Sequence, residues 1–275
     1  MASLTAGRSR RMTLALAVIA AAYVGVCILV FAVQRSLIYF PQPSSLGDRD
    51  TLVVIPVADA RVVASVRPRE GAKAVVYFGG NGEDVTLSIP GLAASFPQHA
   101  LYLLHYRSYG RSGGKPSETA LVGDALALFD LVHREHASIE VVGRSLGTGI
   151  AVQVASARPV ARLVLVTPYD SVSAIAAARF PYLPVRWLLL DRYESSRHAA
   201  RVTAPTLIIA AGNDEVIPRD STERLLTHFQ PGIATLTMIA NGDHNSVSDQ
   251  PDYGRLLGGA VPQTAPGSGA ESRVR

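Results

Sequence analysis

Ser145 has a glycine two residues before it and another two residues after it. The stretch reads Gly143-Arg144-Ser145-Leu146-Gly147 and lies between an apolar, β-branched segment at 138–142 and a helix-like segment at 148–155. A serine flanked in this way between a strand and a helix is typical of a nucleophile elbow. The turn is strained, and a Cβ at either flanking glycine would collide with it. We therefore predict Ser145 as a nucleophile; the alternative is a glycine-rich turn that packs a helix on a strand.

A serine hydroxyl is a poor nucleophile at neutral pH, so it needs a base, and the base needs an orienting acid. In doubly wound hydrolases these residues follow the serine in the order acid, then histidine. Asp214 comes after a predicted strand at 206–210, and His244 comes after one at 235–239. Both would lie at the carboxyl edge of the sheet, where such folds bind ligands. Asp214 is the predicted acid and His244 the predicted base. Asp170, one strand earlier, is the alternative acid, or else a helix N-cap.

The charge that develops on the attacked oxygen needs N–H donors that are already in place. One predicted donor is the amide of Leu146, directly after the nucleophile. The second should come from the loop Phe78-Gly79-Gly80-Asn81-Gly82, where we predict the amide of Asn81, with Gly80 as the alternative. A phosphate-binding loop is disfavoured because no Gly-Lys-Ser or Gly-Lys-Thr follows. The predicted substrate pocket includes Gly80, Tyr106 and Arg144.

The other histidines and the single cysteine fit this chemistry less well. His105 ends a predicted strand and could line the pocket, but it precedes Ser145, which is the wrong order for the base. We expect the remaining five to face solvent: His99, His133, His136, His198 and His228. Cys27 has no cysteine partner, and no cysteine or histidine cluster has metal-ligand spacing. No metal or cofactor is expected.

The elements that must hold these residues follow from hydrophobic patterning between residues 51 and 257. A hairpin of strands at 51–57 and 61–67 comes first, and strand-length and helix-length segments then alternate. This alternation predicts a mostly parallel, doubly wound α/β sheet covered on both faces. Further strands are expected at 74–78, 100–105, 139–142 and 163–167. Helices are expected at 85–96 with a break at Pro90, at 118–135 with Ser117 as the N-cap candidate, and at 146–157, 220–229 and 253–257. The interval 170–204 breaks the pattern with two helical pieces, around 175–179 and 185–190, and predicts a small cap over the carboxyl edge.

The N-terminal region carries a long apolar segment. Residues 12–33 contain no charge and would span about 33 Å as a helix, enough to cross a bilayer core. The segment is longer than the apolar core of a signal peptide, so an uncleaved anchor is favoured. Arginines gather before it, within 1–11, which predicts a cytoplasmic N-terminus and a remaining chain outside the bacterial inner membrane. A connector is expected at 34–50, and a disordered tail at 258–275.

The amino-acid composition and the distribution of charge indicate which kinds of partner this protein can bind. The chain has 275 residues, 48% of them hydrophobic, so it can bury a substantial core. The net charge of +4 comes from scattered arginines, without a basic stripe interleaved with aromatics, so nucleic acid is not an expected partner. The oligomeric state is left open.

Five motifs, in order, resemble those of the membrane-anchored α/β-hydrolase family of the serine aminopeptidase-like type, as in the Bem46-like hydrolases. They are Gly79–Gly82, Tyr106–Gly113, Gly143–Gly147, Gly212–Pro218 and Gly242–Asn245, and the match covers roughly residues 35–257. The resemblance implies an α/β-hydrolase fold with Ser145, Asp214 and His244 as the triad and the Asn81 and Leu146 amides as oxyanion donors. It implies esters, thioesters or lipid acyl groups as substrates. Family members usually have a histidine at the position of Gly79 and an acidic residue at that of His105.

We therefore expect a membrane-anchored serine hydrolase that forms an acyl-enzyme on Ser145 and releases it with water. Two alternatives stay open. A serine peptidase or aminopeptidase acting on short peptides would need acidic groups to bind a free amine, for which Asp191 and Glu194 are available in the cap. A non-catalytic binding protein with a hydrolase fold would be free to lose a triad member, and none is missing here.

Overall fold

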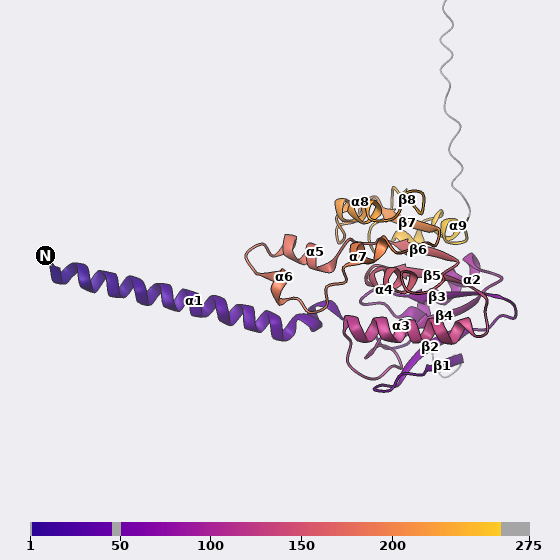
Figure 1. Ribbon diagram of the computed structural model, residues 1–275, viewed down its shortest axis with the longest axis horizontal. Helices are drawn as coiled ribbons and strands as arrows, with labels where there is room; N and C mark the ends of the chain where they lie inside the picture. The colour runs from indigo at the N-terminus through magenta and orange to yellow at the C-terminus, as the bar shows by residue number, and fades with distance from the viewer. Residues whose placement is uncertain (1, 46–50, 260–275) are drawn as a thin grey trace, which may run out of the picture.

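The structure is a computed structural model and describes residues 2–45 and 51–259. Residue 1, the end of the predicted connector at 46–50 and the predicted tail from 260 onward lie outside the described residues. Figure 1 shows a long helix, α1 (Ala2–Ile38), that projects from a layered domain of strands and helices. The termini of the described chain therefore lie far apart, with the N-terminus at the free end of α1.

The domain is built on an eight-stranded sheet with the order β1-β2-β4-β3-β5-β6-β7-β8. The predicted hairpin is confirmed, because β1 and β2 pair antiparallel, and β2 also pairs antiparallel with β4. All the other neighbours pair parallel. The strands are β1 (Thr51–Ile55), β2 (Val62–Arg67), β3 (Lys73–Phe78), β4 (Ala100–Leu104), β5 (Ser138–Arg144), β6 (Arg162–Val166), β7 (Thr206–Ala211) and β8 (Ala234–Ile239).

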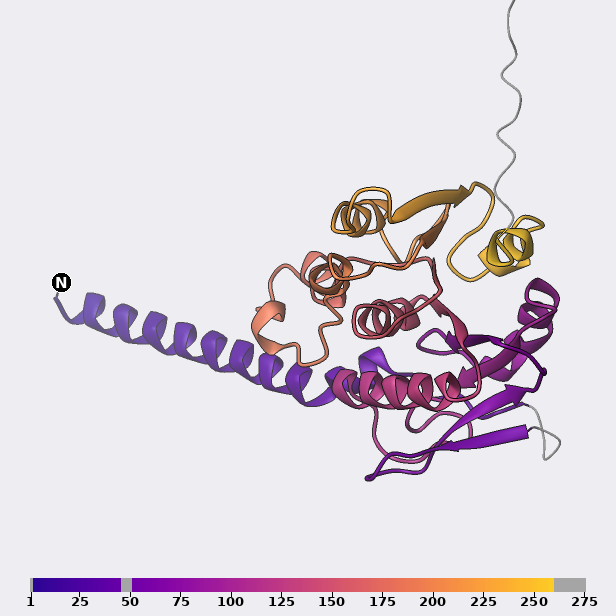
Figure 2. The same ribbon diagram turned by 45° about the vertical axis from the view of Figure 1, so that its right-hand side comes forward.

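Helices cover both faces of the sheet, as the alternating pattern predicts (Figures 1 and 2). One layer contains α3 (Glu118–His133), α4 (Leu146–Ala155), α7 (Ser195–Ala199) and α8 (Arg219–Thr227), and the other contains the short helix η1 (Val85–Ser88), α2 (Ile89–Ser95), η2 (Val247–Asp249) and α9 (Tyr253–Leu257). In β3, Val76 and Phe78 join the first core, while Val75 and Tyr77 join the second. Successive side chains of a strand point to opposite faces, so a strand covered on both faces is apolar throughout.

Two helix boundaries show how local residues set the elements. The hydroxyl of Ser117 accepts a hydrogen bond from the amide of Ala120, so it caps α3 as predicted. The helix predicted at 85–96 with a break at Pro90 is indeed two pieces, η1 and α2, with the break just before Pro90, which lies in the first turn of α2. Proline has no N–H to donate and is tolerated only near a helix start, so one continuous helix cannot run through it.

α1 contains the apolar segment at 12–33. By length and composition, its portion Arg10–Ile38 could cross a membrane, and it is the one such helix among the described residues. An N-terminal signal sequence would meet the same criteria. The helix runs past residue 33 to Ile38, so the predicted connector is helical at its start. Pro41 follows three residues after the end of the helix. Because a proline ring disfavours helical backbone at the residue before it, the helix cannot continue through Phe40.

The segment that interrupts the alternation lies between β6 and β7. It forms α5 (Val172–Arg179), α6 (Val185–Leu188) and α7, three short helices rather than the two predicted pieces. Both views place α5 and α6 beside the C-terminal half of α1 (Figures 1 and 2). The side-chain amide of Gln34 donates to the Leu188 carbonyl at 3.2 Å, and the Tyr23 hydroxyl donates to the Tyr182 carbonyl at 2.9 Å. The insertion therefore packs against the apolar helix.

Candidate active site

The glycine-flanked serine lies at a sharp turn between β5 and α4. Ser145 has φ 49° and ψ −118°, a left-handed conformation that is strained for a residue with a side chain. A Cβ on Gly143 would lie 2.6 Å from the carbonyl oxygen of Gly147, and a Cβ on Gly147 would lie 2.1 Å from that of Phe78. The predicted strain at the serine and the steric need for both glycines are therefore confirmed.

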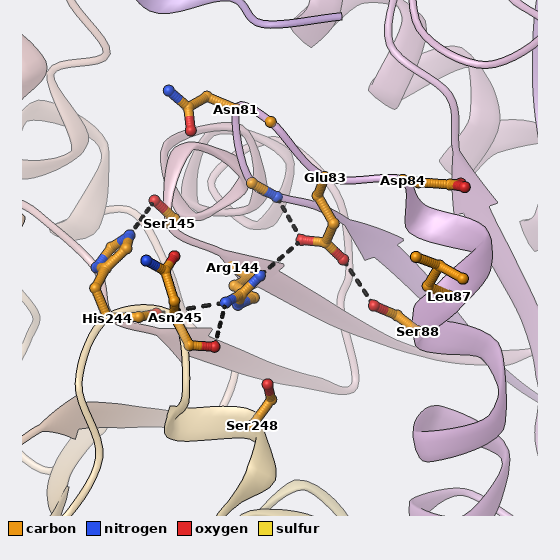
Figure 3. Close-up of a pocket in the computed structure, with 12 residues that line it drawn as sticks. Asn81, Glu83, Asp84, Leu87, Ser88, Arg144, Ser145, His244, Asn245 and Ser248 are labelled. Carbon is orange, nitrogen blue, oxygen red and sulfur yellow. Dashed lines mark hydrogen bonds and ion pairs between the residues drawn. The ribbon is translucent and has the colours of Figure 1, made fainter. Parts of the chain in front are cut away.

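Three side chains from distant parts of the sequence meet at this turn. The Oγ of Ser145 lies 2.9 Å from the Nε2 of His244, and the Nδ1 of the same imidazole lies 2.9 Å from the Oδ2 of Asp214 (Figure 3 shows the first contact). Asp214 follows β7 and His244 follows β8, so both come from loops at the carboxyl edge of the sheet. The imidazole can take a proton from the hydroxyl on one side while the carboxylate holds its other nitrogen.

The loops that carry the acid and the histidine are held by their own backbone. The Oδ1 of Asp214 accepts from the amides of Val216 and Ile217, which fixes the carboxylate. Next to His244, Asp243 accepts from the amides of Ser246 and Asn245. These hydrogen bonds, that from Ser246 first, hold the pKa of Asp243 below its usual range. Asp243 therefore shapes the turn that presents the histidine and does not itself contact the imidazole through a hydrogen bond.

The alternative acid, Asp170, has different partners. Its carboxylate accepts from the Ser221 hydroxyl at 2.6 Å and from the Nε of Arg224 at 2.9 Å. Burial by itself raises the pKa of Asp170, but these hydrogen bonds, that from Arg224 foremost, outweigh it and leave the pKa below its usual range. It is not the N-cap of α5 either, because the hydroxyl of Ser171 accepts the capping bond from Ala174. Asp170 joins the insertion to α8.

The two predicted oxyanion amides stand in different settings. Leu146 is the first residue of α4, so its N–H has no carbonyl partner four residues back within the helix. In the glycine-rich loop, the amide of Gly80 donates to the Oε2 of Glu83 at 2.7 Å, so Gly80 is already engaged and is wrong as the alternative donor. The Asn81 carbonyl accepts from the amide of Phe40 at 3.0 Å and also from the hydroxyl of Tyr109. The loop that carries Asn81 is therefore tied directly to the end of α1.

A carboxylate that the sequence did not point to organises this loop. Glu83 accepts from Tyr77 and Ser88 through Oε1, both at 2.7 Å, and from the Gly80 amide through Oε2. The Nη1 of Arg144 lies 3.3 Å from the same Oε2, and its Nη2 donates to the carbonyl of Asn245 (Figure 3). Burial by itself lowers the pKa of Arg144, but the nearby Glu83 carboxylate outweighs it and raises the pKa.

Glu83 and Arg144 thus link the glycine-rich loop to the loop of His244. The only sequence signal for this link was the position of Arg144 next to the nucleophile. Glu83 lies in an ordinary polar stretch, and nothing local distinguishes it from a solvated side chain.

A pocket of about 440 Å³ opens over the serine. Its walls come from three segments, 80–88, 144–145 and 244–248, so Gly80 and Arg144 line it as predicted. Tyr106 does not: its side chain is buried and its hydroxyl donates to the Gly79 carbonyl at 2.7 Å, beneath the loop. His105 is also buried, with its Nε2 2.8 Å from the Ser65 hydroxyl. His136 is buried against Tyr102, so the expectation that it faces solvent is wrong.

The pocket has no wall from the insertion. The predicted cap leaves the carboxyl end of β6, but it contacts α1 through Tyr23 and Gln34 and contributes no residue to this pocket. Most of the side chains that line the pocket are polar, among them Asn81, Glu83, Asp84, Arg144, Asn245 and Ser248. Within the described residues, no group of three or more histidine, cysteine, aspartate or glutamate side chains is arranged to hold a metal ion.

Comparison with known proteins identifies the class. No family model matches the chain. Over 230 residues it is 34% identical to the uncharacterized protein Rv2307c of Mycobacterium tuberculosis, with 76% of this chain and 80% of that protein covered. Over 168 residues it is 27% identical to the lysophosphatidylserine lipase ABHD12 of Danio rerio, which covers 52% of this chain and 44% of that protein.

The fold comparison agrees. The Pyrococcus furiosus esterase Pf2001 superposes with a TM-score of 0.63 at 15% identity, covering 80% of this chain and 95% of that one. At this identity the likeness shows the fold alone. The sheet order, the helices on both faces and these relatives together place the chain in the α/β-hydrolase family.

Proposed function

We propose that this α/β hydrolase cleaves carboxylic esters or thioesters by a serine mechanism, with Ser145 as nucleophile, His244 as base and Asp214 as acid. The observation that carries the proposal is the continuous chain of contacts from the Ser145 hydroxyl through the His244 imidazole to the Asp214 carboxylate. A serine needs both partners to react near neutral pH. The hydrolase-fold binding protein remains the non-catalytic alternative, and a complete set of partners does not favour it.

The proposed reaction follows from the positions of these atoms. As the Ser145 oxygen bonds to the acyl carbon, its proton passes to the Nε2 of His244. The carbonyl oxygen becomes an oxyanion, for which the amides of Leu146 and Asn81 are the proposed donors; one such donor contributes about 10²–10³ in rate. His244 then returns the proton to the departing alkoxide or thiolate. Water repeats the sequence on the acyl-enzyme, giving the free acid and restoring the serine hydroxyl.

The position of the pocket, next to the end of α1, supports a lipid acyl substrate. The loop of Asn81 receives the amide of Phe40, two residues beyond the end of α1, and the side chain of Asn81 donates to the Ile38 carbonyl. A relative is a lysophosphatidylserine lipase, and the fold is shared with an esterase. The polar lining of the pocket, which includes Arg144 and Asn245, suits an ester whose head group is hydrophilic. We propose substrates of this kind, drawn from the surface of a membrane.

We further propose that α1 is an uncleaved single-pass anchor, as in the Bem46-like branch of the family. The arginines before the apolar segment support a cytoplasmic N-terminus and a hydrolase domain outside the inner membrane. Proteolysis of intact spheroplasts tests the orientation: external protease should digest the domain, and protection of the domain would contradict it.

The peptidase alternative loses the acidic groups on which it depended. Asp191 is buried, and its carboxylate is bound by Arg35, Tyr39 and the amide of Glu118. Glu194 pairs with Arg197 at 2.9 Å. Neither lines the pocket, so neither is placed to bind the amine of a short peptide.

A fluorophosphonate probe tests the nucleophile. We expect the full chain in detergent to be labelled and Ser145→Ala to lose labelling completely. Ser248→Ala is the matched control, because Ser248 lines the same pocket and should leave labelling intact. If the Ser145→Ala protein is still labelled, another residue is the nucleophile.

A further inference from the structure

The surface of the insertion that faces away from the domain is unusually apolar. Residues 180–190 read Phe-Pro-Tyr-Leu-Pro-Val-Arg-Trp-Leu-Leu-Leu, with Arg186 the one charged member. Tyr182 and Trp187 are 88% and 85% exposed, and Phe180 and Leu190 are exposed as well. Large exposed apolar side chains gathered in one segment mark an interaction surface.

This segment contacts α1 at two points, one just after the uncharged run at 12–33 and one in the middle of that run. The Leu190 amide donates to Gln34, the first polar residue after the uncharged run, and the Tyr182 carbonyl accepts from Tyr23. Tyr23 and Gln34 are eleven residues apart, so these contacts are separated by about 16 Å along the helix. Cys27 and Val30, between them on the same helical face, are partly covered, while most of the helix around them is exposed.

A bilayer that surrounds α1 would therefore also surround this segment. The hydrocarbon core is about 30 Å thick, so a depth of about 16 Å corresponds to one leaflet. We propose that residues 180–190 insert into one leaflet beside α1, so that the domain meets the membrane at two elements. This inference rests on the proposed function in one respect, namely that α1 is a membrane anchor.

The backbone of the segment suits a lipid environment. Polar backbone groups in hydrocarbon must find partners within the protein. The amides of Phe180, Leu183, Val185 and Trp187 donate to carbonyls of the segment or of the turn before it, and Pro181 and Pro184 have no amide hydrogen. The amide of Leu190 is satisfied by Gln34. The segment can therefore be buried in hydrocarbon with few unpaired backbone N–H groups.

The polar groups at its edge mark the level of the membrane surface. Arg35 and Asp191 form an ion pair at 3.0 Å, next to Gln34 and Leu190. Trp187 adjoins Leu188, whose carbonyl is also bound by Gln34, so the indole lies near this level, where amphipathic aromatics are favoured. Arg179 and Arg186 are exposed and long enough to reach lipid phosphates. Tyr182, level with Tyr23, would lie deeper.

Trp187 is the one tryptophan of the chain, so its fluorescence reports on the insertion without a label. We would reconstitute the full chain into phosphatidylcholine vesicles. Acyl chains brominated near the carboxyl end should quench Trp187 strongly, and aqueous iodide should quench it weakly. In a Trp187→Phe background, Tyr182→Trp should respond most to bromines near the chain ends. Val54→Trp in the same background is the control, since Val54 is exposed on the edge strand β1 and should respond to iodide alone.

Two results would overturn the proposal. Iodide quenching of Trp187 as strong as that of the Val54→Trp reporter would place the segment in water. Protection from both quenchers would mean that a protein, including a second copy, covers it. Flotation of the protein with the vesicles tests the anchor separately, and its failure would overturn both ideas. Fluorophosphonate labelling reports on Ser145 and is independent of where Trp187 lies.

Discussion

Asp214 and Asp170 follow neighbouring strands, β7 and β6, and both lie near the carboxyl edge of the sheet. Asp214 bonds to an imidazole and to two backbone amides, at 8% side-chain exposure. Asp170 bonds to a hydroxyl, an amide and a guanidinium, at 12% side-chain exposure. Burial and position in the fold are nearly the same.

The difference lies in what the partner can do with a proton. An imidazole can accept a proton from a serine and pass it on, and a carboxylate behind it stabilises the charged form. A guanidinium stays protonated at all accessible pH values, so a carboxylate bound to Arg224 is held as a fixed ion pair. Two carboxylates at one sheet edge are thus separated into a proposed catalytic role and a structural role by their partners.

The largest expected effect is the loss of the carboxylate behind the imidazole. Asp214→Asn should lower kcat for a short-chain ester by about 10⁴-fold, because the amide cannot stabilise the imidazolium or fix its tautomer. Steady-state kinetics on the full chain in detergent measures this. A loss below about tenfold, together with a large loss in Asp170→Asn, would reverse the comparison.

Glu83 is a third carboxylate that can be compared with Asp214 and Asp170, and it holds the glycine-rich loop in place. Glu83→Gln should lower kcat by roughly tenfold to a hundredfold with little change in KM, because the Gly80–Asn81 backbone loses its anionic anchor; removal of an oxyanion donor itself costs about 10²–10³. Ser88→Ala is the matched control, since it removes a single hydrogen bond to the same carboxylate. An equal effect of the two variants would show that the charge of Glu83 is unimportant.

The smallest catalytic effect is expected at Asp170. Asp170→Asn should change kcat by no more than about twofold, equivalent to about 0.5 kcal/mol in the barrier. It should lower the free energy of unfolding by about 1–3 kcal/mol, because Ser221 and Arg224 lose their charged acceptor. Urea unfolding of the full chain in detergent measures the second quantity.

The same variant has a pH signature. The pKa of Asp170 is lower in the folded state than in the unfolded chain, where it is about 3.9. Its contribution to stability is therefore complete above the unfolded pKa and disappears as the pH falls through the folded one. The stability gap between wild type and Asp170→Asn should be constant near neutral pH and narrow below about pH 4. If the difference in the free energy of unfolding persists at low pH, the stabilisation by Asp170 comes from packing and not from its charge.

The sequence anticipated most of the sheet and the three residues proposed for catalysis. Strand and helix periods are local properties, and Gly143 is required within the five-residue turn by the Gly147 carbonyl. Gly147 itself is required by the Phe78 carbonyl of β3, a contact that the local motif nevertheless anticipates. The positions of Asp214 and His244 followed from chain order, since parallel strands bring their carboxyl ends to one edge. Their roles remain proposals until the variants are measured.

The errors arose where the decisive partner is far away in the chain. Tyr106 was assigned to the pocket, yet it lies beneath the loop because Gly79, 27 residues earlier, accepts its hydroxyl. Glu83 was missed because its link to the loop of His244 depends on Arg144, 61 residues later, while its nearer partners Tyr77 and Ser88 form no recognisable pattern. The length of the insertion predicted a cap at the carboxyl edge, but it could not predict the contacts of that cap with Tyr23 and Gln34 of α1.

By itself, the sequence determined the alternating elements, the apolar N-terminal helix and the strained turn at Ser145, because each depends on residues within a few positions of one another. Only the tertiary structure decided that Asp214 and not Asp170 meets the imidazole, that Glu83 meets Arg144, and that 180–190 runs along α1. Side-chain partners are chosen by distance in space, and no local pattern encodes the distance between residues some 30 to 160 positions apart.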